Sequence, residues 1–137
     1  MTEHFSLEEL TASDIARRRG IANEPKADDV RRLRQLCLLL LEPLREVTGP
    51  LRVTSGYRSA ALNVAVGGTR DSAHRYGCAA DVVPANFSVG SAWAAAQRLG
   101  LPYDQCIWER RGETEWLHIA LPRPGETARG QAFRIWR

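Results

Sequence analysis

One long segment with helical periodicity, residues 27–47, constrains the fold of this chain more than any other feature. Its apolar side chains recur every three or four residues and therefore fall on one face of a helix. They are Val30, Leu33, Leu36, Cys37, Leu40, Leu41 and Leu44. We expect this segment to form the main core helix, with Pro43 kinking it or ending its regular part and Gly49-Pro50 closing it.

Shorter helices and several strands are predicted around this segment. Ser6 and Glu9 have the spacing of a capping box, which indicates a helix, and a second helix is expected from Ser13 to Gly20. Further along, the pattern predicts helices over 60–66 and 88–100, an ordered loop over 69–77, and strands over 51–54, 79–83, 103–108, 116–121 and 133–136. A turn at 110–113 would make a hairpin, and the last segment would be an edge strand. Early helices followed by a largely antiparallel sheet indicate an α+β fold.

The length of 137 residues suits one domain, and no linker or internal repeat divides it. We expect a single domain over 1–137, with a helical part over 1–50, a core over 51–121 that carries the candidate site, and a C-terminal loop and edge strand over 122–137. The composition, 44% hydrophobic and 26% charged, is typical of a soluble globular protein. A chain of this size needs no metal merely to fold.

The formal charge of +3 favours encounters with anionic polymers, which include nucleic acid, anionic lipid and bacterial cell wall. The basic clusters at 17–19 and 31–34 are separated by acidic residues, and no nucleic-acid-binding motif accompanies them. We therefore interpret them as solvated helix faces and expect no nucleic-acid partner.

Cysteine usage and the N-terminus both bear on the compartment. The cysteines Cys37, Cys78 and Cys106 are odd in number and widely spaced, which is typical of free thiols in a reducing environment. The first residues lack the basic and apolar regions of a secretory signal, and the longest apolar run, 36–41, is too short to cross a bilayer. We expect synthesis in the cytoplasm without membrane insertion, so that an extracellular target would require another export route.

The residues best suited to metal binding or catalysis are two of the three histidines and one aspartate. His74 and Asp81 lie in one ten-residue stretch, and His118 follows later. Two imidazoles and a carboxylate are the ligand set of a catalytic zinc ion, because three protein ligands leave a fourth tetrahedral position for water. The alternative is that they are unrelated surface or hydrogen-bonded core residues.

Several short motifs surround these residues in a fixed order. They are Ser55-Gly56-Tyr57-Arg58-Ser59, Leu62-Asn63, Val66-Gly67-Gly68, Ser72-x-His74-x-x-Gly77-x-Ala79-x-Asp81, Asp104-Gln105 and Glu115-Trp116-x-His118. Together they resemble the zinc D-alanyl-D-alanine carboxypeptidase and L-alanyl-D-glutamate endopeptidase family, which shares a fold with the Hedgehog signalling domain. The resemblance spans residues 51–120, and the N-terminal helices are similar to those of small phage or prophage endolysins.

The resemblance implies a role for each site residue. His74, Asp81 and His118 would hold one catalytic Zn²⁺, whose bound water is the nucleophile; Arg58 would stabilise the oxyanion and Glu115 would be the general base. Side chains of a regular strand alternate, however, so positions 115 and 118 would face opposite sides. We therefore expect Glu115 at the start of its strand or on a bulge, with Glu113 as a less favoured base.

Four further residues are candidates for substrate binding: Ser72, Tyr57, Asp104 and Gln105. Each has a structural alternative. Ser72 could cap the loop that carries His74, Tyr57 could belong to the core, and the Asp104-Gln105 pair could be purely structural.

The resulting hypothesis is a monomeric zinc metallopeptidase that hydrolyses an amide bond in the peptide stem of bacterial peptidoglycan. The missing signal fits a phage or prophage enzyme that reaches the wall by holin-dependent release or as part of a phage particle. The alternatives are a D-Ala-D-Ala carboxypeptidase and a catalytically silent zinc-containing wall-binding or virion structural protein. The bond cleaved and the target bacterium are left open.

Overall fold

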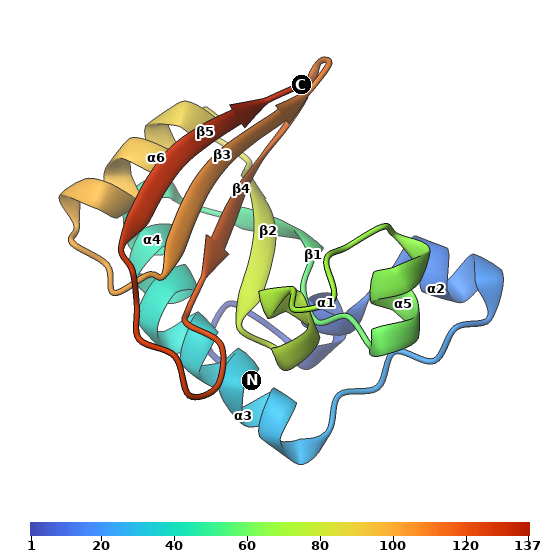
Figure 1. Cartoon of the computed structure of the whole chain (residues 1–137). Coiled ribbons are helices and arrows are strands. Elements are labelled where there is room, and N and C mark those ends of the chain that lie inside the picture. Colours follow the sequence, from blue (N-terminus) through green and yellow to red (C-terminus); the bar gives the residue numbers. More distant parts are fainter.

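The computed structural model describes residues 1–137 and contains one mixed sheet of five strands packed against helices (Figure 1). The strands are β1 (Leu51–Ser55), β2 (Ala79–Pro84), β3 (Gln105–Arg111), β4 (Thr114–Ala120) and β5 (Gln131–Trp136). Their order in the sheet is β1-β2-β4-β3-β5, and every neighbouring pair is antiparallel except β3 and β5. The predicted α+β class with a mainly antiparallel sheet is confirmed.

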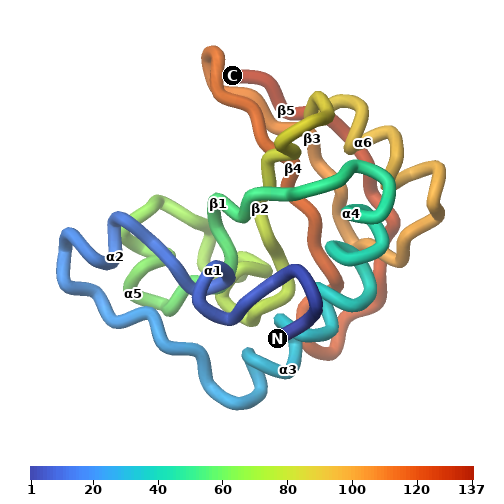
Figure 2. The backbone as a smooth tube through the Cα atoms, turned by 180° about the vertical axis from the view of Figure 1, so that it is seen from behind, coloured from blue at the N-terminus to red at the C-terminus, as the bar shows by residue number.

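The helices are α1 (Leu7–Thr11), α2 (Asp14–Arg19), α3 (Ala27–Leu36), α4 (Glu42–Thr48), α5 (Ala60–Ala65) and α6 (Val89–Arg98), with a π-helical turn η1 (Cys37–Leu41) and a 3₁₀ helix η2 (Ala73–Tyr76). Ser6 and Glu9 form the predicted capping box at the start of α1. In both views α4 and α6 lie together, on the opposite side of the molecule from α2 and α5 (Figures 1 and 2). No helix is both long and apolar enough to cross a bilayer.

The predicted core helix is present as one continuous helical path through α3, η1 and α4. Leu33, Leu36, Leu40, Leu41 and Leu44 are fully buried along it. The expected disturbance at Pro43 takes the form of the π turn just before it, where the Glu42 N–H donates to the Cys37 carbonyl instead of to the residue four positions back. Proline has no N–H to donate, so a locally wider turn before Pro43 allows the helix to continue.

The two faces of the sheet have different surroundings. Strand residues of one parity, including Ala80, Val82, Cys106, Leu117 and Ile119, are fully buried in the hydrophobic core. The residues between them along β2 and β4 include Asp81 and His118 and point to the other side. We call the side with the buried residues the helix face and the side with Asp81 and His118 the metal face. Their separation follows from the alternation of side chains along a strand.

Two local differences from the predicted elements affect the site. Residues 69–77, predicted to be an ordered loop, contain η2, which ends at Gly77 in the left-handed conformation (φ 73°). Strands β3 and β4 are also longer than predicted, so only Gly112 and Glu113 form the turn of the hairpin, and Glu115 pairs with Arg110 inside the ladder.

Candidate metal centre

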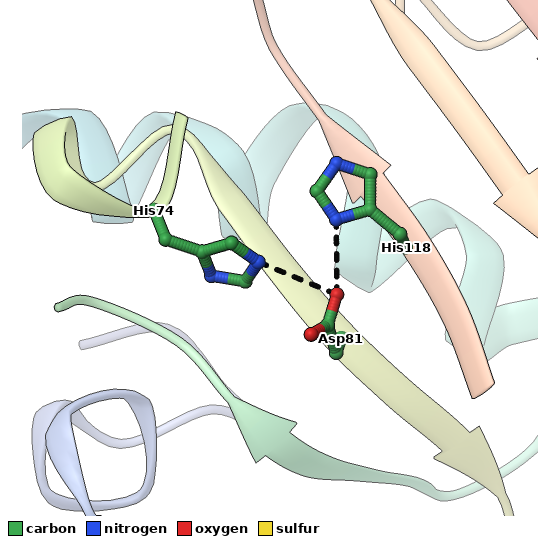
Figure 3. Close-up of side chains that lie close together, drawn as sticks. All are labelled: His74, Asp81 and His118. Atoms are coloured by element: carbon green, nitrogen blue, oxygen red, sulfur yellow. Dashed lines mark hydrogen bonds and ion pairs between the residues drawn. The ribbon is translucent and has the colours of Figure 1, made fainter. Parts of the chain in front are cut away.

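The three predicted metal ligands converge from three elements. His74 comes from η2, Asp81 from β2 and His118 from β4, where Asp81 and His118 are direct partners in the ladder. The His118 Nδ1 lies 2.9 Å and the His74 Nε2 3.4 Å from the Asp81 Oδ1. Figure 3 shows the two imidazoles approaching one carboxylate from different sides. One ligand atom from each residue lies within 4.8 Å of the others, a spacing that could hold a metal ion.

The backbone of Gly56 sets the tautomer of His74. The His74 Nδ1 lies 2.7 Å from the Gly56 carbonyl oxygen. A carbonyl can only accept, so Nδ1 carries a proton, and in the neutral imidazole Nε2 then holds the lone pair that can bind a metal ion. A carbonyl behind a histidine is the usual partner that orients a metal-binding imidazole. The donor set of two imidazole nitrogens and one carboxylate oxygen therefore fits Zn²⁺.

Gly56 is required because helix α1 approaches the strand end closely. A Cβ at this position would collide with the Leu10 carbonyl. The same carbonyl accepts a 2.7 Å hydrogen bond from the Tyr57 N–H, so α1 fixes the backbone that holds His74. This explains in physical terms why the motif needs glycine just before the Tyr57-Arg58 pair.

The protonation states of Asp81 and the two histidines depend on one another. Burial alone would raise the pKa of the Asp81 carboxyl, but the charges and hydrogen bonds of His74 and His118 hold it well below its ordinary value. Burial opposes protonation of His118, yet the hydrogen bond and charge of Asp81, with a contribution from Glu109, raise the pKa of the imidazole. A carboxylate that stays ionised is suited to bind a cation.

Arg58 lies beside the centre and is held by three side chains. Its guanidinium is within 3.2 Å of the Ser55 Oγ, 3.4 Å of the Asn63 Oδ1 and 3.8 Å of the Asp81 Oδ2. Burial lowers the pKa of Arg58, against the charges of Asp81 and Glu109. Asn63 is buried and also donates to the Thr69 carbonyl at 2.7 Å, so it ties Arg58 to the loop before η2. Asn63 belongs to one of the motifs found in the sequence, but no role was predicted for it.

Glu115 lies on the helix face, away from His118. Pairing of β3 with β4 runs without interruption from Gln105↔Ala120 to Arg111↔Thr114, so no bulge changes the alternation. The Glu115 Oε1 accepts a 2.7 Å hydrogen bond from the Trp108 Nε1, and the Trp108 ring packs 5.9 Å from that of Trp93 on α6. Glu113 is exposed in the hairpin turn.

Glu109 is the acidic residue of this hairpin on the metal face. It is paired with Trp116, whose Nε1 donates to the Glu109 Oε2 at 3.0 Å. Glu109 was not predicted from the sequence because it is nine residues from His118 along the chain, whereas Glu113 and Glu115 are closer. The signal that could have found it is the hairpin register, since a two-residue turn at 112–113 places Glu109 beside Trp116.

Three of the four predicted substrate-binding residues border one cavity beside His118. This cavity has a volume of about 280 Å³, and its lining includes Ser72, Asp104, Gln105, Arg123 and Arg129. The Ser72 hydroxyl also accepts from the His74 N–H at 3.3 Å, as a cap of η2.

The remaining candidates have clear structural contacts. Asp104 is buried and bound by the Arg129 guanidinium at 2.7 and 3.0 Å, and Gln105 donates to the Gln131 side chain at 3.2 Å. Tyr57 is buried in the core, and it also borders a different cavity with Arg58.

Comparison with known proteins agrees with this geometry. The sequence model of the family described as Peptidase M15 matches residues 3–120, a range that includes all three candidate ligands and Arg58. No curated protein matches the chain.

Proposed function

Because the chain belongs to the M15 family of zinc metallopeptidases, we propose that it hydrolyses an amide bond in the peptide stem of bacterial peptidoglycan. The observation that carries the proposal is the convergence of His74, Asp81 and His118, with the His74 ring oriented by the Gly56 carbonyl so that its Nε2 faces the other two residues. A bound Zn²⁺ would polarise the substrate carbonyl and lower the pKa of water. The other roles belong to side chains of the chain itself.

Arg58 is placed to stabilise negative charge on the carbonyl oxygen of the substrate. Ser55 and Asn63 hold its guanidinium near the ligands before substrate arrives, so little reorganisation is needed during the reaction. A donor preorganised in this way typically contributes a few kcal/mol to stabilisation of a transition state. We therefore assign the oxyanion role to Arg58.

The cavity beside His118 supports a polar peptide as substrate, because Ser72, Gln105 and two arginines border it. Both arginines are already engaged, Arg129 by Asp104 and Arg123 by Glu126 at 2.8 Å. An unpaired cationic side chain is the strongest partner for the terminal carboxylate that a carboxypeptidase binds. The engaged arginines therefore favour cleavage within the stem over removal of a terminal D-Ala.

The experiment is incubation of the purified zinc-loaded protein with peptidoglycan and with defined stem peptides, followed by mass analysis of soluble products. We expect fragments from internal cleavage, and no products from protein treated with chelator or from the His74→Ala variant. Release of D-Ala alone would identify the carboxypeptidase alternative. Binding of wall without any product, on every wall type tried, would support the silent wall-binding protein instead.

The proposal extends to the place of action. The net charge of +3 would concentrate a monomeric enzyme on the anionic wall. We propose that the protein reaches the wall after holin-type release or within a phage particle. Expression in bacteria with and without a holin tests this, and lysis that is independent of the holin would argue against that route.

A further inference from the structure

We propose that Glu109, rather than Glu115, is the carboxylate that takes the proton from the attacking water and returns it to the leaving amine. This inference rests on the proposed hydrolysis and identifies the residue that moves the proton in it. Three observations lead to it: the register of the hairpin, the position of Glu109 on the metal face, and the different partners of the two carboxylates.

The register keeps Glu115 away from the centre. Turning Glu115 to the metal face would require β4 to slip by one residue against β3 or to acquire a bulge. A slip would also turn Leu117 and Ile119 out of the core, where both are fully buried. Exposing two such side chains is far more costly than any gain from one carboxylate. The alternation is therefore enforced by packing.

Glu109 has the right face and the right neighbours. It follows Ile107, the direct ladder partner of His118, by two residues, so Glu109 and His118 are diagonal neighbours on one face. Diagonal neighbours in an antiparallel ladder are about 7 Å apart, and a glutamate side chain can bridge much of that distance. The negative charge of Glu109 favours the protonated forms of both His118 and Arg58, so its carboxylate lies within electrostatic range of both side chains.

The hydrogen bonds of Glu109 leave it able to act. Trp116 donates to Oε2 and fixes the carboxylate, whereas the structure shows no hydrogen bond to Oε1. Oε1 can therefore accept a proton. In Glu115, by contrast, Oε1 accepts the hydrogen bond from Trp108 on the helix face. A substrate bound at the three ligands cannot reach that face.

The proton movement balances over one cycle. Oε1 of Glu109 takes a proton from water as the water oxygen forms a bond to the amide carbon. The same proton passes to the amide nitrogen as the C–N bond breaks, so that a carboxyl product and a free amine leave and Glu109 is again ionised. General acid–base catalysis of this kind typically accelerates a reaction by about 10²–10⁴-fold.

The test compares Glu109→Gln with Glu115→Gln in the zinc-loaded protein. We expect Glu109→Gln to lower kcat by about a hundredfold or more, with zinc affinity and melting temperature close to the wild type. Glu115→Gln should lose less than about tenfold. Glu46→Gln, which alters an exposed acid on α4, is the matched control. If the glutamine variant does not fold, Glu109→Asp takes its place, because it keeps the charge on a shorter side chain.

Trp116→Phe tests the positioning of Glu109. The ring is kept but the donor to Oε2 is lost, so kcat should fall while KM stays near the wild-type value. A purely structural role of Trp116 would lower stability without lowering kcat.

A second readout needs no hydrolysis. Zinc is added to metal-free ¹⁵N-labelled protein, and the four indole N–H signals are assigned by Trp→Phe substitutions. The Trp116 signal should shift more than the Trp108 signal, because only the former is bonded to a carboxylate on the metal face.

The outcomes separate the two proposals. An active wild type in which Glu109→Gln keeps its rate, or loses no more than Glu115→Gln, overturns the assignment of Glu109 alone. A zinc-induced shift confined to Trp108 overturns it as well. A wild type that binds zinc but hydrolyses nothing overturns the proposed function, and the inference that depends on it.

Discussion

Two tryptophan–glutamate pairs on the same hairpin make the same type of hydrogen bond in opposite surroundings. In each, an indole N–H donates to a carboxylate across the ladder, at 2.7 Å for Trp108 and Glu115 and at 3.0 Å for Trp116 and Glu109. The first pair packs against α6, and the second shares a face with His118. The alternation of side chains along each strand therefore places the same type of hydrogen bond in two different environments. We expect stability to depend on the first pair and catalysis on the second.

Removal of the metal should have the largest effect and should act on the metal face only. Treatment with a chelator is expected to lower hydrolysis by about a thousandfold or more, because the polarisation of carbonyl and water is lost. The 22-residue core contains none of the three ligands, so the protein should stay folded. Hydrolysis and near-ultraviolet circular dichroism measure the two effects. Global unfolding on chelation, or failure of added Zn²⁺ to restore activity, would contradict the separation of the faces.

Leu117→Ala, a substitution on the helix face, should have a large effect on stability. The side chain is fully buried, and its truncation is expected to lower the free energy of unfolding by about 3 kcal/mol. Thr114→Ala changes an exposed residue of β4 on the metal face and serves as control, with an expected change within about 0.5 kcal/mol. Urea denaturation of both variants gives the comparison. Equal losses would mean that the two faces are packed alike.

Which face a residue takes was the part of the site hardest to predict from sequence. The candidate ligands His74, Asp81 and His118 could be predicted from their residue types and from the motifs around them, and the structure brings them together. Whether position 115 meets position 118 depends on where the turn lies. A four-residue turn at 110–113 would have left Glu115 free to lie before the ladder, whereas the observed two-residue turn pairs it with Arg110.

The elements themselves followed the sequence wherever one local signal dominates. The apolar stripe of residues 27–47 predicted the core helix, and Ser6 with Glu9 predicted the start of α1. The π turn before Pro43 and the 3₁₀ helix that carries His74 were not predicted. Both are single turns whose form depends on tertiary contacts; Gly77, for example, lies so close to the Asp29 carbonyl that no side chain fits there. Short elements of this kind leave no periodic pattern.

Glu115→Ala should have a moderate effect on stability. The substitution leaves the half-buried Trp108 N–H without its acceptor, and we expect a loss of about 1 kcal/mol in the free energy of unfolding. Glu113→Ala removes an exposed acid two residues away and should change the free energy by less than about 0.5 kcal/mol. Thermal unfolding of the two variants is sufficient. If Glu115→Ala is as stable as its control, the pair on the helix face contributes nothing and the contrast with Trp116 and Glu109 loses its basis.

The smallest effect should come from a pair that belongs to neither face. Hydrogen bonds from Arg129 hold the pKa of Asp104 below its usual value, although burial opposes them. As the pH falls, the unfolded chain therefore takes up the proton first. The stabilisation is complete above the pKa of an unfolded aspartate, about 4, and fades as the pH falls below it. Asp104→Asn should reduce stability at pH 7 and should differ progressively less from the wild type below about pH 4.

Urea denaturation across this pH range measures the effect, with Asp14→Asn as the matched control. Asp14 pairs with Arg17 on the surface of α2, where both side chains are mostly exposed, so its removal should change stability little at any pH. Asp104 also accepts from the Arg129 N–H at 2.9 Å, and its carbonyl accepts from the Gln131 N–H at the same distance. These bonds anchor the start of β5 to the start of β3. No difference between Asp104→Asn and wild type at pH 7 would show that this anchor depends on the backbone bonds and not on the charge of Asp104.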